Sequence, residues 1–219
     1  MRRIVLLSIA VVVVVLAIAS QFVLPAIAAQ QLRDRLARSG KVLDVEVDAF
    51  PAIELLWHQA DRVVIRMASY RSSPGHLDSL LADASNVGSL DASARVLDTG
   101  LLALRNATLS KRGSTVTGSA TVTESDLRTA LPILQSVVPV ASGGGQLTLR
   151  GTASLPLLGD TTVDATVKAL NGALVVAPDV PFGALATLTL FSNRSLYVDA
   201  VGASPAAGGF TVTARGRVR

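Results

Sequence analysis

The sequence predicts an α+β domain that is built on long antiparallel strands and preceded by an apolar N-terminal helix. Two observations lead to this class. After residue 40 the spacing of apolar residues changes from a helical period to the alternation typical of half-buried strands, and alternation dominates most of the chain that follows. The segments come in the order helix, strands, helix, strands, which is typical of α+β folds and not of repeated βαβ units.

Residues 4–24 form an apolar segment behind two arginines. A basic start followed by an apolar core is typical of an export signal, and about 20 residues at ~1.5 Å each are enough to cross a bilayer. The small residues at 26 and 28 match a cleavage site, whereas the unbroken length favours a retained anchor. We therefore expect a signal peptide or membrane anchor over 1–24, with a cytoplasmic N-terminus if it is retained. One periplasmic or extracytoplasmic domain is expected over 25–219.

The composition limits both the stabilising chemistry and the partners. Cysteine is absent, so neither disulfides nor a lipid-modified cysteine is available. The formal charge of +4 falls to +2 when Arg2 and Arg3 are left out, which does not indicate nucleic-acid binding. Aromatic residues make up 4 % of the chain, so the interior is expected to consist of small aliphatic side chains.

The first element of the domain is a helix over residues 25–39. Apolar positions recur there on one face, with Gly40 as the expected C-terminal cap; they are Ile27, Ala28, Leu32 and Leu36. Four basic residues lie just beyond the apolar segment, namely Arg33, Arg35, Arg38 and Lys41. They are expected either to contact anionic lipid headgroups or to form an ordinary solvated face.

Strands follow this helix. Residues 43–49 and 63–67 alternate between apolar and polar, and the link between them, residues 50–57, is too apolar for an exposed loop. It must be buried or face lipid. Residues 71–98 fit either a helix or a strand, and the neighbouring strands favour a strand.

The second half predicts a hairpin over 101–122 that turns at residues 111–113. A helix is expected from Thr123 to residue 138, because Thr123 and Asp126 resemble a capping box, with a kink at Pro132. Residues 142–145 are expected to be a flexible connection. The remaining alternating segments predict strands over 146–155, 162–169, 173–177, 196–200 and 210–218, with a tight turn at Asn171-Gly172.

No catalytic or metal-binding motif is present in the sequence. The two histidines lie in no HxxxH or HExxH arrangement, and no Gly-x-Ser-x-Gly elbow occurs. Asp44, Glu46 and Asp48 could form a carboxylate cluster, but their period of two is more typical of a solvated strand face. We expect no metal and no cofactor.

Three stretches carry a resemblance to a known family. They are the helix Pro25–Ser39, the block from Val42 to Met67 with Phe50-Pro51 at its centre, and the threonine-rich strand that runs into a helix over Thr121–Leu127. In these the chain resembles the actinobacterial LmeA-like phospholipid-binding proteins. It departs from the family pattern at Ala49, where a glycine is usual. The resemblance implies a long, curved antiparallel sheet wrapped around one or two helices, as in the tubular lipid-binding folds.

The same resemblance implies a membrane-associated, non-catalytic protein that binds an anionic phospholipid, for example a phosphoinositide, and supports envelope lipid or lipoglycan maintenance. Expected acyl-chain contacts are Phe50, Pro51, Ile53, Leu55, Leu56, Trp57, Val63, Ile65, Leu127, Leu131 and Leu134. Expected headgroup contacts are the four basic residues at 33, 35, 38 and 41. The alternative is a structural envelope protein that acts through protein partners. An enzyme would depend on the acidic strand face alone.

Overall fold

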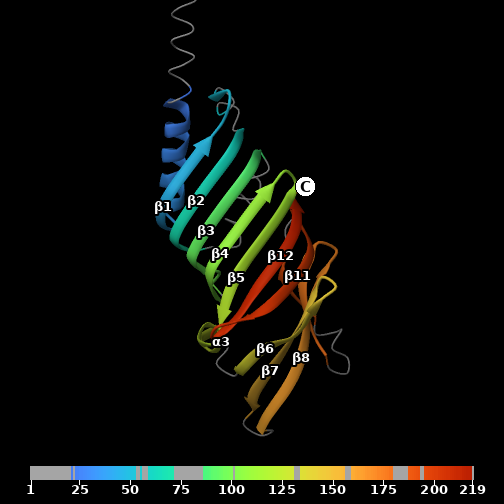
Figure 1. Ribbon diagram of the computed structural model, residues 1–219. Helices are drawn as coiled ribbons and strands as arrows, with labels where there is room; N and C mark the ends of the chain where they lie inside the picture. The colour runs from blue at the N-terminus through green and yellow to red at the C-terminus, as the bar shows by residue number, and fades with distance from the viewer. Residues whose placement is uncertain are drawn as a thin grey trace, which may run out of the picture.

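The computed structural model describes residues 21, 23–52, 55, 59–71, 86–100, 102–130, 134–155, 159–179, 187–192 and 195–218. Strands dominate these residues and form two sheets (Figure 1). The seven-stranded sheet has the order β1-β2-β3-β4-β5-β12-β11, and the five-stranded sheet has the order β10-β9-β8-β7-β6. A β-rich domain with short helices is confirmed, whereas the single sheet expected from the resemblance is wrong.

Most element bounds follow the predicted alternation closely; the exceptions are residues 134–143, expected to be helical in their first half, and residues 188–191, for which no strand was predicted. The larger sheet consists of β1 (Gly40–Asp48), β2 (Ala60–Arg71), β3 (Val87–Asp98), β4 (Ala103–Arg112), β5 (Thr115–Thr123), β11 (Leu196–Ala206) and β12 (Gly209–Val218). The smaller consists of β6 (Leu134–Gly143), β7 (Gln146–Leu155), β8 (Gly159–Leu170), β9 (Ala173–Pro178) and β10 (Leu188–Phe191). A helix covers residues 23–37, and α3 (Glu124–Ala130) follows β5.

Strand pairing is antiparallel except between β2 and β3, which run in parallel. The purely antiparallel expectation is wrong at this pair, because parallel neighbours need a crossover connection rather than a hairpin. The second half of the ambiguous segment 71–98 is the strand β3. Its first half, residues 72–85, lies outside the described residues.

The N-terminal helix packs on β1 to β3. Leu36 is buried with Met67 and Tyr70, and Leu32 packs against this group, as the helical spacing predicted. Two expectations about this helix are wrong. Ile27 is 48 % exposed, since the helix packs on the sheet through Leu32 and Leu36. Gly40 begins β1 instead of capping the helix.

A β-bulge near the start of β1 changes which side chains face the helix. The register shifts on both sides of Val42, which pairs with Met67, and the next pair joins Asp44 to Arg66. Leu43 is the extra residue and is exposed, while Val42 packs into the cluster under the helix. Strict alternation from Leu43 was therefore wrong at this one position, since a bulge reverses the faces.

The second half differs from the expectation at the turn of the first hairpin and in the helix after β5. β4 continues through Lys111 and Arg112, and the chain turns at residues 113–114. The expected helix from Thr123 ends at Ala130, and residues 134–143 form β6, in which Pro139 pairs with Leu149. β6 is at the edge of its sheet, where a proline is tolerated because its missing N–H points away from the ladder.

The glycine-rich segment 142–145 is a tight turn between β6 and β7, not a flexible connection. Gly144 and Gly145 adopt positive φ angles of 60° and 78°. The backbone N–H of Val201 donates to the Gly145 carbonyl at 3.1 Å, and the N–H of Ala203 donates to the Ser142 hydroxyl at 3.0 Å. The turn therefore joins the smaller sheet to β11.

Two further core clusters lie where the smaller sheet meets β5, β11 and β12. One is centred on Val122, Val137 and Phe210, and the other on Leu147, Val167 and Val201. Val212 packs against both. The seven-stranded sheet is therefore covered by the N-terminal helix near its β1 edge and by the smaller sheet near its β11 edge (Figure 1).

The N-terminal apolar segment lies outside the described residues up to position 20. Within the part of the chain that the structure describes, no helix has both the length and the apolar character needed to cross a membrane. Signal peptide or anchor thus stays a prediction.

Candidate functional site

Strand register shows that the helix and the smaller sheet cover the same face of the seven-stranded sheet. Met67, which lies under the helix, pairs with Ala94. On β3, β4 and β5 the residues on this face alternate with those on the opposite face, and the pair Leu109–Gly118 lies on it. On the next strand pair, Ala120 lies opposite Val212, which is under the smaller sheet. We call this side of the sheet the helix-bearing face.

Between the two covers, the helix-bearing face presents a strip of small apolar residues. We call it the apolar strip; its members on β3, β4 and β5 are Ala92, Ala94, Ala107, Leu109, Gly118 and Ala120. All six are only half-buried, while Met67 and Val122 on either side are fully buried. No member is larger than leucine, and among the described residues the strip offers half-buried apolar surface. Contact with an acyl chain would stabilise the complex by about 0.8 kcal/mol for each methylene group that it buries.

A buried lysine lies at one end of this face. Lys111 occupies the position between Leu90 and Val116, is 3 % exposed, and donates through Nζ to the carbonyl of Val87. Burial lowers the pKa of Lys111 because it penalises the charged form. Sequence reasoning missed this residue because it placed residues 111–113 in a turn; the alternation Ala107, Leu109, Lys111 was the available signal.

Lys111 lines a cavity of about 440 Å³ at the end of the sheet where β2 and β3 begin. The other lining residues are Gln59, Ala60, Asp61, Asn86, Val87, Gly88 and Gly113. Polar groups therefore gather at this end of an otherwise apolar face.

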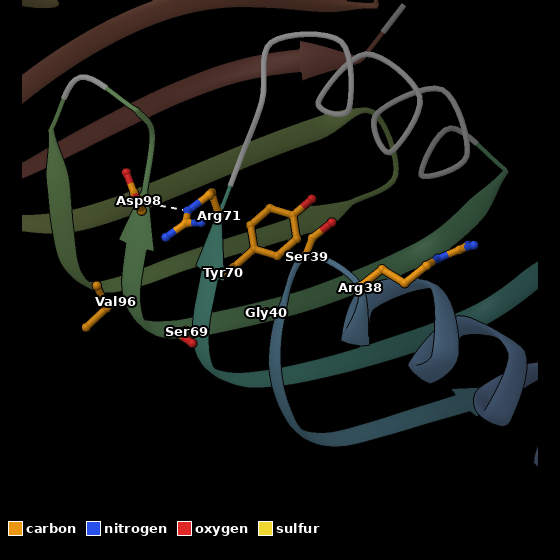
Figure 2. A pocket seen from close by; sticks show the side chains of 8 residues that line it. All are labelled: Arg38, Ser39, Gly40, Ser69, Tyr70, Arg71, Val96 and Asp98. Carbon is orange, nitrogen blue, oxygen red and sulfur yellow. Dashed lines mark hydrogen bonds and ion pairs between the residues drawn. The ribbon is translucent and has the colours of Figure 1, made fainter.

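A second cavity, of about 610 Å³, lies at the opposite end of β2. Ser69, Tyr70 and Arg71 line it together with Arg38 from the end of the helix (Figure 2). Arg71 donates to Asp98 at 3.2 Å, and Figure 2 shows the Arg38 side chain pointing away from this pair. The two guanidinium groups therefore do not converge on a common anion.

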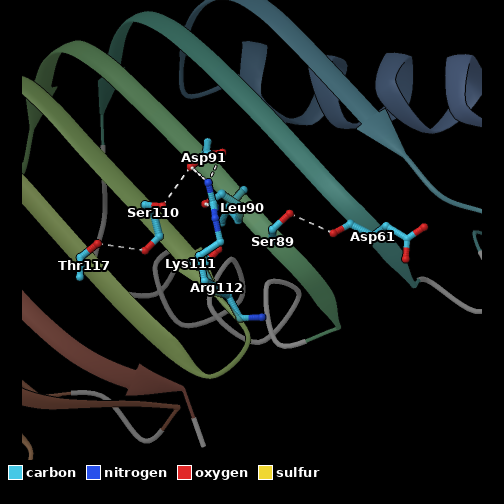
Figure 3. Close-up of polar contacts among 8 residues, drawn as sticks. All are labelled: Asp61, Ser89, Leu90, Asp91, Ser110, Lys111, Arg112 and Thr117. Atoms are coloured by element: carbon cyan, nitrogen blue, oxygen red, sulfur yellow. Dashed lines mark hydrogen bonds and ion pairs between the residues drawn. The ribbon is translucent and has the colours of Figure 1, made fainter.

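The face opposite the helix carries cross-strand ion pairs (Figure 3). Arg112 donates two hydrogen bonds to Asp91, at 2.9 and 2.8 Å, and Ser110 adds a third at 3.0 Å. These bonds hold the pKa of Asp91 below its usual value. This face is therefore polar and internally paired.

Two acidic side chains of β1 are likewise paired with an arginine of the neighbouring strand. Arg66 contacts Asp44 at 2.7 Å and Glu46 at 3.9 Å, so a cation from β2 lies against these carboxylates. Among the described residues no group of three histidine, cysteine or acidic side chains could hold a metal ion.

The predicted acyl-chain contacts do not lie together. Phe50 is 79 % exposed beyond the end of β1, Val63 is buried on the helix-bearing face with Ile65 beside it, and Leu127 packs near the smaller sheet. Pro51 is exposed, Leu55 is half-buried, and Leu134 begins β6. The structure does not describe Ile53, Leu56, Trp57 and Leu131. Their lipid-binding role stays a prediction.

The predicted headgroup contacts are spread along the helix and into β1. Arg33, Arg35, Arg38 and Lys41 are all exposed. Arg38 lies 17 residues beyond Gln21, which corresponds to roughly 25 Å along a helix. Arg38 is therefore at the opposite end of the sheet from the N-terminal segment, whereas the sequence analysis placed all four beside it.

The fold and the apolar strip together define a β-rich protein in which an apolar part of the larger sheet is only half-buried by the residues that the structure describes. The sequence matches the family model described as LmeA-like phospholipid-binding over residues 15–215. Since this match covers most of the chain, the chain belongs to that family, and the resemblance stated from the sequence is confirmed.

Two other comparisons add little. The STAR-related lipid transfer protein (fragment 25–204) from Xanthomonas axonopodis is similar at 13 % identity and a TM-score of 0.20, over 53 % of this chain and 75 % of that chain. A similarity of that size supports no structural argument. No curated protein matches the chain.

Proposed function

We propose that the protein binds a phospholipid without catalysis, with the acyl chains lying along the apolar strip. Family membership supports the ligand class. The single structural observation that carries the proposal is the strip itself, because half-buried alanine, glycine and leucine residues lie between the buried residues under the helix and those under the smaller sheet. An apolar ligand would complete the burial that the helix and the smaller sheet leave unfinished.

The chemistry of the strip supports binding over catalysis. Its members are apolar, and Lys111 is the buried charged residue of the described part of the chain. The carboxylates of Asp91 and Asp164 form ion pairs with arginines on the neighbouring strands. An acid–base pair facing the strip is thus lacking among the described residues.

The cellular setting is part of the same proposal. The apolar segment over 4–24 would hold the domain at the outer side of the cytoplasmic membrane, where phospholipid is at hand. An anionic lipid, for example a phosphoinositide, and a role in envelope lipid or lipoglycan maintenance are proposed on this basis.

The test is native mass spectrometry of the full chain purified from its own membrane. Ala92→Glu places a carboxylate on the strip, and Ser93→Glu places the same group on the opposite face one residue away. We expect bound phospholipid in the parent and in Ser93→Glu, and loss of it in Ala92→Glu. Ala92→Phe fills the strip without adding charge. Loss of lipid in this variant as well would show that occupying the strip is enough to exclude the ligand, without the unfolding that a buried carboxylate could cause.

Lipid retained equally by all variants would contradict the strip as the site. A stoichiometric protein partner with no lipid in the parent would favour a structural envelope protein.

A further inference from the structure

Large apolar side chains are exposed at one end of the domain. Phe50 follows β1 and is 79 % exposed, and Val23 and Ile27 on the N-terminal helix are 53 % and 48 % exposed. Val23 and Ile27 are four residues apart, so they lie on one face of the helix. Exposed apolar groups gathered in one region mark a surface that meets another apolar phase.

Two hydrogen bonds anchor the Phe50 loop, one to the start of the helix and one to β2. The N–H of Ala52 donates to the side-chain carbonyl of Gln21 at 3.2 Å, across 31 residues of chain. The N–H of Phe50 donates to Asp61 at 2.7 Å. Ala52 is fully buried, so the loop is anchored at its base while the Phe50 ring stays outside.

The chain that precedes Gln21 identifies the occupant of this surface. Residues 4–19 contain a single polar side chain, Ser8, and follow two arginines. That segment joins the domain at Gln21, the residue that contacts Ala52. A lipid phase that accepts residues 4–19 would therefore begin next to Phe50.

We propose that the Phe50 loop is a second membrane contact, which inserts Phe50 into the lipid surface beside the N-terminal segment. Two contacts fix an orientation that a single anchor leaves free. The helix runs antiparallel to β1, because Gln21 is near Ala52 and Ser39 bonds to Arg71 at the other end of β2. The end with Phe50 and Lys111 thus faces the bilayer, and α3 and the β11–β12 turn face away from it.

This inference rests on the membrane-anchoring part of the proposed function and not on lipid binding at the strip. The chain contains one tryptophan, Trp57, so a Trp57→Phe background allows a single tryptophan to be placed elsewhere. The three probes are Phe50→Trp, Val23→Trp as the anchor control, and Ala207→Trp in the exposed β11–β12 turn as the distal control. Each full chain is reconstituted in vesicles of phosphatidylcholine and phosphatidylglycerol, with or without bromine on the acyl chains.

Bromine on the acyl chains quenches a tryptophan that enters the acyl region, and interfacial apolar groups reach about 5–10 Å into the boundary between headgroups and acyl chains. We expect quenching for Phe50→Trp and Val23→Trp, and equal fluorescence in both vesicles for Ala207→Trp. Quenching at 23 without quenching at 50 would overturn the second contact and leave the anchor intact. No quenching at either position would overturn both. A blue-shifted but unquenched probe at 50 would indicate a protein occupant and likewise overturn the proposal.

The unmodified chain supplies an independent measurement. Backbone amides of Ala49 and Phe50 should exchange more slowly with solvent in the vesicles than after the lipid is replaced by a short-chain detergent, while those of residues 206–208 should not change. Equal exchange at Ala49 and Phe50 in both conditions would contradict insertion, whatever the folding of the variants.

Discussion

Arg105 and Asp126 form a two-point ion pair that joins β4 to the first turn of α3. The guanidinium donates at 2.7 Å and 2.9 Å to the two carboxylate oxygens. Thr123 donates to the same carboxylate at 2.6 Å and accepts from the Asp126 N–H at 3.2 Å. The capping arrangement predicted from Thr123 and Asp126 is confirmed, and Arg105 adds a partner that only the fold brings there.

Asp126→Asn should lower the free energy of unfolding by about 1–2 kcal/mol at pH 7, because it weakens the bonds to Arg105 and Thr123. Those bonds lower the pKa of Asp126, so their stabilisation is present above the unfolded pKa of about 3.9 and is lost as pH falls through the folded value. Urea unfolding at pH 7 and pH 3 measures both effects. Glu124→Gln, which removes a 3.6 Å exposed pair, should change stability by less than about 0.5 kcal/mol.

Lys111→Met should remove a pH dependence of stability in the alkaline range. Burial lowers the pKa of Lys111, so the unfolded chain holds this proton more tightly, and the parent gains stability as pH rises from the folded pKa toward about 10.4. The stability of Lys111→Met minus that of the parent should therefore decrease across that interval in urea titrations. Lys168→Met, at an exposed position, is the control. A constant difference with pH would argue that Lys111 titrates as a solvated lysine.

Gly172→Ala should destabilise the β8–β9 hairpin by about 2–4 kcal/mol. Gly172 has a φ of 82°, and an added Cβ would lie 2.4 Å from Cδ2 of Tyr197. Gly100 has nearly the same φ, 81°, with open space around it. Gly100→Ala should cost only about 1 kcal/mol, from the backbone conformation alone. Thermal unfolding of the pair separates the contact with Tyr197 from the φ effect, and equal losses would show that Tyr197 simply moves aside.

Leu36→Ala should reduce stability by about 2–4 kcal/mol, because the side chain is buried against Met67 and Tyr70. Hydrogen exchange should accelerate in the helix over residues 23–37 more than in β7 and β8, which belong to another cluster. Leu170→Ala, at a 48 % exposed position, serves as the comparison and should change stability by less than about 1 kcal/mol. Uniform acceleration through the chain would instead show that the helix and both sheets open together.

Local patterns were sufficient for most single elements. Alternation predicted β1, β2, β4, β5 and β7 within a few residues, and Asn171-Gly172 turns with positive φ angles of 52° and 82° as its sequence requires. The helix over 123–138 was wrong from Leu134 onward, since Val138 and its neighbours satisfy a helical period and also pair with β7. Pairing with β7, which begins after the turn at 144–145, decides in favour of the strand over the helix.

By itself the sequence determined the long strands and the apolar N-terminal segment, because these depend on composition and on periodicity within short windows. The family followed from the resemblance of three stretches, and the family model that matches residues 15–215 confirms it. Tertiary structure alone decided that β11 and β12 join β5, that β2 and β3 run in parallel, and that Lys111 is buried at the end of an apolar face. The first two follow from pairing between strands that no hairpin joins, and the burial of Lys111 follows from the register of β4 with its neighbours. The apolar strip likewise depends on pairing, since its six residues come from three strands and become neighbours only when those strands pair.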